Sequence, residues 1–225
     1  MNWRLSNVKN HCIRAAATRL SRHVKGHMKK IVSLFQRNYD GDRQVRDEVV
    51  PGAEWVAAGE GMATRKWDGM AVMVANGAIF KRYDAKAGRT PPADFMPAQP
   101  AADEATGHWP GWVPAVGPDS ARIIEGVEWG VRTLFGGGPV PDGTYEVCGP
   151  KIGTRHGANP ERLTEHILVP HGKDPLPECP RTFNALREYL TVHVIEGIVW
   201  HHPDGRMAKI KASDFGIKRV QSSTT

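Results

Sequence analysis

The sequence of 225 residues lacks a long apolar run, paired cysteines and a P-loop, which are the features of membrane-spanning, disulfide- or zinc-stabilised and P-loop proteins. No apolar run approaches the roughly 20 residues that a helix needs to span a membrane. Cys12, Cys148 and Cys179 never form a C-x-x-C pair, which argues against a zinc site or a disulfide framework and favours a reducing cytoplasm. A phosphate-binding P-loop is also missing, because the glycines at 136–138 are not followed by Lys-Ser or Lys-Thr.

Acidic residues are absent before Asp40, whereas the first 30 residues are rich in lysine and arginine. Three interpretations stay open for this segment: an RNA-binding arm, a mitochondrial targeting segment, or a mis-assigned extension (1–27) ahead of a start at Met28. The net charge of +6 and the isoelectric point of about 9.3 favour a polyanion as the partner. We therefore separate a basic extension (1–27) and a short tail (221–225) from the region 28–220.

Residues 28–220 are predicted to form one domain of the α+β class, with antiparallel sheets and flanking helices. The hydrophobic patterns predict strands at 30–36, 55–58, 70–74, 78–83, 144–148, 192–200 and 207–211, and helices at 159–166 and 181–191. Asn76-Gly77 and Pro203-Asp204-Gly205 predict hairpin turns. The remaining segments are expected to be a loop or short helix (41–52), a long surface excursion (87–120) and a helical or mixed stretch (121–135).

Lys66-Trp67-Asp68-Gly69 is the most informative pattern when it is combined with Glu196 and with Lys209-Ile210-Lys211 downstream. A lysine that acts as a nucleophile must be partly neutral, and burial or nearby cations lower its pKa. Lys209 and Lys211 alternate on a predicted strand and so face the same side. On a side facing Lys66 they would repel its proton and hold nucleotide phosphates. The alternative is the exposed face of an edge strand, which charged lysines protect from aggregation.

Each acidic candidate has a structural alternative as well. Asp68-Gly69 is a common turn pair, and such a turn would place Asp68 near ribose hydroxyls as an acceptor. Glu146 could bond the ribose or bind a metal, or it could be a structural carboxylate with a protein partner. Glu196 sits within the otherwise apolar predicted strand 192–200 and needs a partner, which a metal-bound phosphate or a structural salt bridge would supply. His201-His202 are interpreted as solvated hairpin residues, with a metal pair as the alternative.

The ordered motifs resemble those of the covalent nucleotidyltransferases, which comprise DNA ligases, RNA ligases and mRNA capping enzymes. The closer similarity is to the compact eukaryotic-type 5′–3′ RNA ligases. It runs from about 55 to 220 through the segments 64–69, 82–86, 107–114, 152–154, 168–172, 196–201, 204–205 and 209. Its most specific parts are Pro110-Gly111-Trp112-Val113-Pro114 and Glu196-Gly197-Ile198-Val199-Trp200-His201.

The resemblance implies a nucleotidyltransferase (adenylation) domain and an ATP-dependent RNA ligase that forms a lysyl-AMP intermediate. It would join an RNA 5′-phosphate to a 3′-hydroxyl in RNA repair, with ATP and Mg²⁺, which Mn²⁺ can replace. The implied catalytic residues are Lys66, Glu196, Lys209 and Lys211, and the implied metal ligands are Glu146 and Glu196. The residues implied in nucleotide binding are Thr64 near the adenine, Lys66, Asp68, Gly69, Arg82 at the ribose or phosphates, Lys86, Glu146, Lys209 and Lys211.

The sequence departs from the family pattern in one place, because Met70, Ala71 and Val72 stand where many members have an arginine. The chain also ends soon after Lys211, from which we expect no C-terminal OB domain. Two other readings stay open: another lysine-adenylating enzyme, such as a nicked-DNA ligase or a protein AMP-transferase, and a non-catalytic RNA-binding module. In each case we expect a cytoplasmic protein with no membrane contact and no obligate protein partner.

Overall fold

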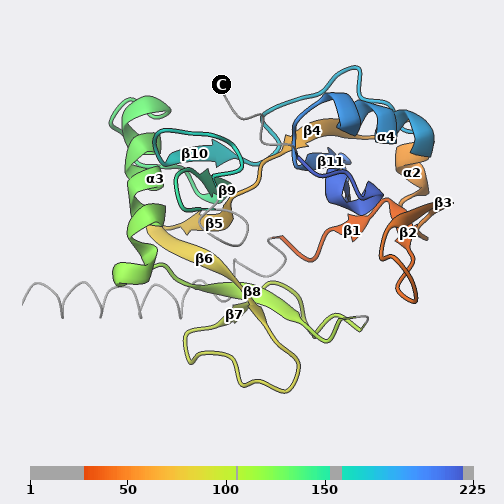
Figure 1. Cartoon of the computed structure of the whole chain (residues 1–225). Helices are drawn as coiled ribbons and strands as arrows, with labels where there is room; N and C mark the ends of the chain where they lie inside the picture. Colours follow the sequence, from red (N-terminus) through yellow and green to blue (C-terminus); the bar gives the residue numbers. More distant parts are fainter. Residues whose placement is uncertain (1–27, 105, 153–158, 220–225) are drawn as a thin grey trace, which may run out of the picture. The chain divides into compact units, whose positions relative to one another are not determined.

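The computed structural model describes residues 28–104, 106–152 and 159–219. In this part of the chain it shows a mixed α+β protein of mostly antiparallel sheets, which confirms the predicted class (Figure 1). The described residues divide into two compact units, of which unit 1 contains 28–30 and 69–170 and unit 2 contains 31–68 and 171–219. The predicted extension (1–27), the motif positions 153–154 and the tail lie outside the described residues.

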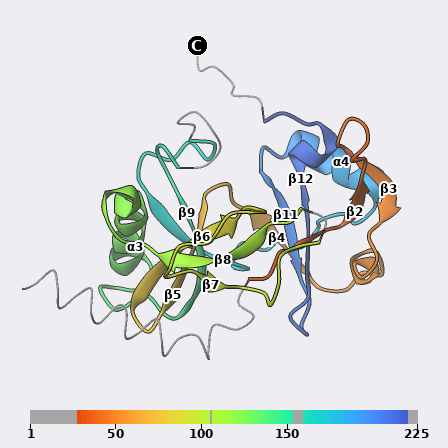
Figure 2. The same cartoon turned by 90° about the horizontal axis from the view of Figure 1, so that it is seen from below.

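Unit 2 is built on a sheet with the strand order β1-β12-β11-β4. Its strands are β1 (Val32–Ser33), β4 (Met62–Lys66), β11 (Gly197–His201) and β12 (Met207–Lys211). Neighbouring strands are antiparallel except β1, which pairs with β12 in parallel. Figure 2 shows β4, β11 and β12 side by side. Strand β12 therefore lies inside the sheet, with a partner on each side.

The two faces of this sheet differ because side chains alternate along each strand. One face contributes Ile198, Trp200 and Ile210 to the core, where they pack with Leu186 and Leu190 and are almost fully buried. The two leucines belong to α4 (Phe183–Val192), which lies along this core. The rest of unit 2 comprises β2 (Phe35–Arg37), β3 (Val45–Val49), α2 (Glu54–Ala57) and the short η2 (Ala212–Phe215). Burial of one face directs the alternate residues of β4 and β12 to the other.

Unit 1 contains a sheet with the order β10-β9-β5-β6-β8-β7. Its strands are β5 (Met70–Ala75), β6 (Ala78–Ala85), β7 (Met96–Pro97), β8 (Trp109–Pro114), β9 (Gly143–Cys148) and β10 (Ile167–Pro170). Helix α3 (Ala121–Thr133) follows η1 (Pro118–Ser120) and lies against β9 and β10 (Figure 1). Gly126 and Gly130 allow this close approach, because an added Cβ would lie 2.6 Å from Val147 Cγ1 or 2.7 Å from Leu168 Cδ2.

Several predicted elements are confirmed, among them the strands at 70–74, 78–83, 144–148 and 207–211, the helix at 181–191 and the helical content of 121–135. The Asn76-Gly77 hairpin turn is also confirmed, and both residues have positive φ, at 48° and 71°. This combination is the one that a two-residue turn of type I′ requires. The well-predicted elements are those with a strong turn signal or a long periodic pattern.

Other predictions are wrong. Residues 55–58, predicted as a strand, lie mostly in helix α2, and the predicted helix at 159–166 is absent from these residues. The segment 41–52, predicted as a loop or short helix, includes strand β3. The predicted strand 30–36 is interrupted at Leu34, between β1 and β2. Of 192–200, only the part from Gly197 is strand. Within 87–120, β8 is a sheet strand and its Trp112 is fully buried. The four apolar residues 55–58 are too few to distinguish a helix from a strand. The prolines of β8 suggested a loop.

Along residues 28–104, 106–152 and 159–219, no helix combines the length and the apolar character that crossing a membrane requires.

Candidate functional site

The polar face of the unit 2 sheet brings together the lysines that the motifs singled out. Gly197 on β11 lies opposite Lys66 of β4 on one side and Lys211 of β12 on the other. Two residues further along, Val199 lies opposite Thr64 and Lys209 in the same way. We call Thr64, Lys66, Lys209 and Lys211 with the adjoining Glu196 the lysine face.

The Glu196 carboxylate, one residue before β11, bridges two of these lysines. Lys66 Nζ donates to Glu196 Oε2 at 2.5 Å, and Lys211 Nζ lies 3.1 Å from Glu196 Oε1. The side chain of Glu196 is only 13% exposed. Burial raises the pKa of Glu196, but the charges and hydrogen bonds of Lys66 and Lys211 outweigh it, and the pKa lies below its ordinary value. Glu196 is therefore an anion at neutral pH, and it already has partners in the protein.

Lys209 has a perturbed acidity. Burial, followed by repulsion from Lys211 and Lys66, lowers the pKa of Lys209 from 10.5 to about 8. The lowered pKa that the sequence analysis expects for Lys66 stays a prediction. Lys66 contacts the Glu196 carboxylate, and such a contact favours the ammonium form.

Replacing Lys209 by methionine is expected to remove a pH dependence of stability. Between pH 8 and 10.5 the unfolded chain binds more protons at Lys209 than the folded protein, so stability from this group rises with pH. The rise amounts to at most about 3 kcal/mol. Urea unfolding at several pH values should show the free-energy difference between wild type and Lys209→Met changing across this window. A constant difference would contradict the assigned acidity.

Two ion pairs lie at the ends of the lysine face, and of their four residues only Asp68 was singled out from the sequence. Asp214 in η2 accepts a hydrogen bond of 2.9 Å from the backbone N–H of Lys211 and forms an ion pair with Arg37. Asp68, only 7% exposed, forms an ion pair with Arg219. Asp214 stands three residues after Lys211, a spacing typical of helix starts that could have revealed it. The partner of Asp68 carried no such signal.

The other predicted residues belong to unit 1. The backbone N–H of Gly69 donates to Glu146 Oε1 at 3.2 Å, and Glu146, on β9, is 8% exposed. Only glycine fits here, because a Cβ at Gly69 would lie 2.9 Å from Glu146 Cγ and would clash with the Val147 carbonyl. The structure thus brings Gly69 and Glu146 together, and the predicted metal shared by Glu146 and Glu196 stays a prediction.

Arg82 and Lys86, predicted to bind the nucleotide, lie at β6 of unit 1. The Arg82 guanidinium donates to Asp84 Oδ1 at 2.9 Å and to the Met28 carbonyl at 2.6 Å, and it lies 5.6 Å from the Trp112 ring centroid. Lys86 follows the end of β6 and is exposed. Within unit 1 the guanidinium of Arg82 therefore already has hydrogen-bond partners in the protein, and its predicted contact with a nucleotide stays a prediction.

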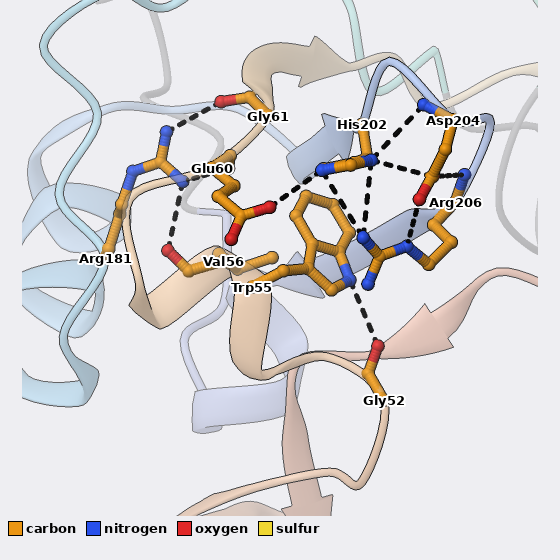
Figure 3. Close-up of polar contacts among 9 residues, drawn as sticks. All are labelled: Gly52, Trp55, Val56, Glu60, Gly61, Arg181, His202, Asp204 and Arg206. Carbon is orange, nitrogen blue, oxygen red and sulfur yellow. Dashed lines mark hydrogen bonds and ion pairs between the residues drawn. The ribbon is translucent and has the colours of Figure 1, made fainter.

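His201 ends strand β11 and His202 follows it, and the two imidazoles contact different residues. His201 Nε2 lies 3.0 Å from Thr64 Oγ1 on the lysine face. His202 lies between two carboxylates, 2.8 Å from Glu60 Oε2 and 2.7 Å from Asp204 Oδ1, with Trp55 beside it (Figure 3). The prediction that both are solvated is wrong for His202, because its side chain is only 16% exposed.

The cluster in Figure 3 also shows how this end of unit 2 is held together. Arg181 donates to the carbonyl oxygens of Val56, Glu60 and Gly61, which lie at and just after the end of α2. Arg206 donates to Asp204 Oδ2 at 2.7 Å. These contacts connect the segment before β4 to α2 and to the turn between β11 and β12. The contacts of His202 with Glu60 and Asp204 are sufficient to hold its imidazole in place.

The described residues contain no group of three or more His, Cys, Asp or Glu side chains that could hold a metal ion. Glu196 alone still suits Mg²⁺, because it is ionised and offers hard oxygen ligands. Mg²⁺ commonly binds through one or two carboxylates and the phosphates of its substrate. A metal at the lysine face would therefore need further oxygen ligands from a bound molecule.

The sequence matches no model of a known protein family, and a search of curated proteins also found no match. What the protein does must therefore follow from the chemistry of its residues. The lysine face offers the most distinctive chemistry, since one carboxylate is set among three lysines.

Proposed function

We propose that this protein is an ATP-dependent RNA ligase of the covalent nucleotidyltransferase type, with Lys66 as the nucleophile. One observation carries the proposal: Glu196 bridges Lys66 and Lys211 on a sheet face that also holds the half-buried Lys209. Three ammonium groups gather near Glu196, and the other carboxylate whose charge acts on Lys209, that of Asp214, is itself paired with Arg37. An arrangement of this kind suits a bound polyanion such as a triphosphate.

The alternative explanation of Lys209 and Lys211 as protection for an edge strand does not fit. Strand β12 pairs with β1 on one side and with β11 on the other, so it is not at the edge of its sheet. Lys209 is half-buried, and burial together with the charges of Lys211 and Lys66 lowers its pKa to about 8.

In the proposed first step, Lys66 separates from Glu196, the carboxylate that would hold Mg²⁺ if the nucleotide binds with a metal. Lys209 and Lys211 then disfavour the positive charge on Lys66, which gives up one proton to solvent. The neutral amine attacks the α-phosphorus of ATP, an N–P bond forms, and the P–O bond to the β-phosphate breaks. Pyrophosphate leaves with the bonding electrons, and a second proton leaves the nitrogen. Lys209 and Lys211 stabilise the charge on the transferring phosphate.

Bound Mg²⁺ would supply a Lewis acid that neutralises phosphate charge, and Glu196 is the residue of unit 2 that would hold it. In the second step an oxygen of an RNA 5′-phosphate attacks the lysine-bound phosphorus, and Lys66 leaves as an amine that regains its proton. In the third step an RNA 3′-hydroxyl attacks the activated 5′-phosphorus, loses its proton to solvent and displaces AMP. The lysine face then returns to its starting state.

The test begins with purified protein, Mg²⁺ and ATP labelled at either the α- or the γ-phosphate, followed by denaturing electrophoresis. Label from the α-position alone is expected on the protein. Labelled protein is then given RNA with a 5′-phosphate, RNA with a 5′-hydroxyl, or nicked DNA. Transfer to the 5′-phosphate RNA and joining of its ends supports the proposal. Transfer only to DNA or to a protein acceptor overturns the RNA specificity.

Absence of label with both ATP and GTP, from protein shown to be folded, would overturn covalent catalysis. Retained RNA binding in that case would favour the non-catalytic RNA-binding module. A filter-binding measurement with the same RNA provides this comparison.

A further inference from the structure

Three aromatic rings lie together in unit 1, where β8 has β6 on one side and β7 on the other (Figure 1). The ring centroids of Tyr83 and Phe95 are 6.0 Å apart, and those of Phe95 and Trp109 are 5.5 Å apart. Both contacts are edge-to-face, with interplanar angles of 69° and 67°. We call Tyr83, Phe95 and Trp109 the ring cluster.

The central ring of this cluster packs on the backbone of a glycine in β8. Gly111 is in register with Tyr83, and an added Cβ at Gly111 would clash with the ring of Phe95. Phe95 therefore lies directly on the strand, with Tyr83 beside it. The indole of Trp109 is fixed as well, because its Nε1 donates to the Gln99 carbonyl at 2.8 Å. These contacts hold the rings in place before any ligand binds.

The ring cluster is open to solvent, unlike other ring contacts of the protein. Tyr83 is 36% exposed, and Phe95 and Trp109 are half-buried. Phe35 and Phe215 of unit 2 also make an edge-to-face contact, but both are buried in the core. Core packing explains the second contact. It does not explain an ordered tyrosine ring at the surface.

Positive side chains accompany the ring cluster along β6 and the turn that follows it. Lys81 stands two residues before Tyr83 on β6, so both side chains point to the same face of the sheet. Lys86 and Arg89 are exposed, and the backbone N–H of Arg89 donates to the Lys86 carbonyl at 3.0 Å. Cations spaced along a surface in this way attract the phosphates of a nucleic acid.

The acidic residues of the same segment do not cancel this charge. Asp84 points to the opposite face of β6 from Tyr83, and it accepts a hydrogen bond of 2.9 Å from Arg82 on that face. Asp94 is the remaining acidic residue of the segment 81–95. The segment therefore carries positive charge in excess beside an exposed ring.

We propose that the ring cluster binds single-stranded RNA, with a base stacked on Tyr83 and the flanking phosphates held by the lysine and arginine side chains of 81–89. This inference rests on the proposed function, because it takes the partner to be the RNA that is joined. Aromatic rings accept every base, since each base has a flat π face. A duplex hides these faces within its stack, so the surface favours unpaired nucleotides. Phe95 and Trp109 are positioning residues.

The test measures the fluorescence anisotropy of a labelled, unstructured RNA and of the same RNA annealed to its complement, using the full-length protein. Tyr83→Ala should weaken binding of the single strand by about 5- to 150-fold, the range expected when one stacked base is lost. Binding of the duplex should change by less than about twofold. Covalent labelling by ATP should stay at the wild-type level, because Tyr83 takes no part in the first step.

Matched variants separate stacking from folding. Tyr83→Phe keeps the ring and should bind within about twofold of wild type. Tyr83→Leu keeps apolar bulk on the strand without a π face and should lose binding as Tyr83→Ala does. Tyr39→Ala, which removes an exposed tyrosine of unit 2, should bind as wild type. Circular dichroism and thermal melting establish that each variant is folded.

The salt dependence of binding tests the charged part of the surface. Arg89→Gln should reduce the slope of log K against log salt concentration by about 0.7, the value for one phosphate contact of a single strand. Tyr83→Ala should leave this slope unchanged, because a stacked base releases no counterions. An unchanged slope in Arg89→Gln would overturn the phosphate contact at this residue.

The outcomes distinguish this inference from the proposed function. Undiminished RNA binding by folded Tyr83→Ala, or full rescue by Tyr83→Leu, would overturn the inference and leave covalent catalysis intact. Tighter binding of single-stranded DNA than of RNA would overturn the choice of partner. RNA binding that depends on the Tyr83 ring, in a protein that ATP never labels, would support the inference and overturn the proposed chemistry.

Discussion

Replacing Lys66 by arginine is expected to abolish covalent labelling by ATP while the protein stays folded. Arginine keeps a positive charge beside Glu196, which Lys66 contacts at 2.5 Å, but its guanidinium does not lose a proton near neutral pH. Labelling should fall by more than about 1,000-fold, as expected when a nucleophile is removed. Lys66→Ala should lose labelling equally and keep most RNA binding. Denaturing electrophoresis with α-labelled ATP measures the first effect, and filter binding measures the second.

The matched control for Lys66 is Lys173→Ala, because Lys173 is an exposed lysine of the same unit. It should label as wild type does. Circular dichroism and thermal melting should show that Lys66→Arg is folded. Full labelling of either Lys66 variant would refute the assignment of the nucleophile, whatever the remaining activity of the protein.

Replacing Glu196 by glutamine is expected to reduce both stability and labelling. The carboxylate contacts Lys66 and Lys211, and the side chains of Lys66 and Glu196 are 21% and 13% exposed. Removing it leaves neighbouring ammonium groups without their shared counter-charge, which should lower the free energy of unfolding by roughly 2–3 kcal/mol at pH 7. Urea unfolding measures this loss. Labelling at low Mg²⁺ should fall at least tenfold because a metal ligand is lost.

The loss of stability in Glu196→Gln has a predictable dependence on pH. The folded pKa of Glu196 lies below its unfolded value, so its contribution is complete above the unfolded pKa of about 4.3. The contribution is lost as the pH falls through the lower, folded pKa. The difference between wild type and Glu196→Gln should therefore shrink as the pH falls below about 4.

Two comparisons isolate the role of Glu196. Glu188→Gln, an exposed carboxylate on α4 of the same unit, should leave stability and labelling close to wild type. In a Lys66→Met background, Glu196→Gln should cost less than in wild type, because one of the two bridged lysines is already gone. Wild-type labelling by Glu196→Gln at low Mg²⁺ would remove its proposed metal role. Equal losses of stability in both backgrounds would remove the proposed coupling.

The contrast between confirmed and wrong elements has a physical basis. Asn76-Gly77 predicted its hairpin because two adjacent residues with positive φ are a strong local requirement. Trp55 and Val56 were assigned to a strand but form the buried side of helix α2, because four residues are too few to reveal a period. In β8, Pro110 suggested a loop, yet its carbonyl accepts the bond from Ala98 and its nitrogen needs no partner there.

Some features of the candidate site could be predicted from local patterns and others could not. Alternation along a strand predicted that Lys209 and Lys211 lie on one side, and the structure confirms it. The register of three strands could not be read from the sequence, and it is this register that sets Gly197 between Lys66 and Lys211. Arg219 carried no local signal, because its ion pair with Asp68 joins residues far apart in the chain.

The sequence by itself determined the α+β class, the main hairpins and the residue types available for chemistry, because these depend on local periodicity and turn geometry. The tertiary structure decided which charges meet. Glu196 bridges Lys66 and Lys211, and Lys209 has a lowered pKa. Acidity depends on burial and on neighbours within a few ångströms, and those neighbours are brought together only by folding.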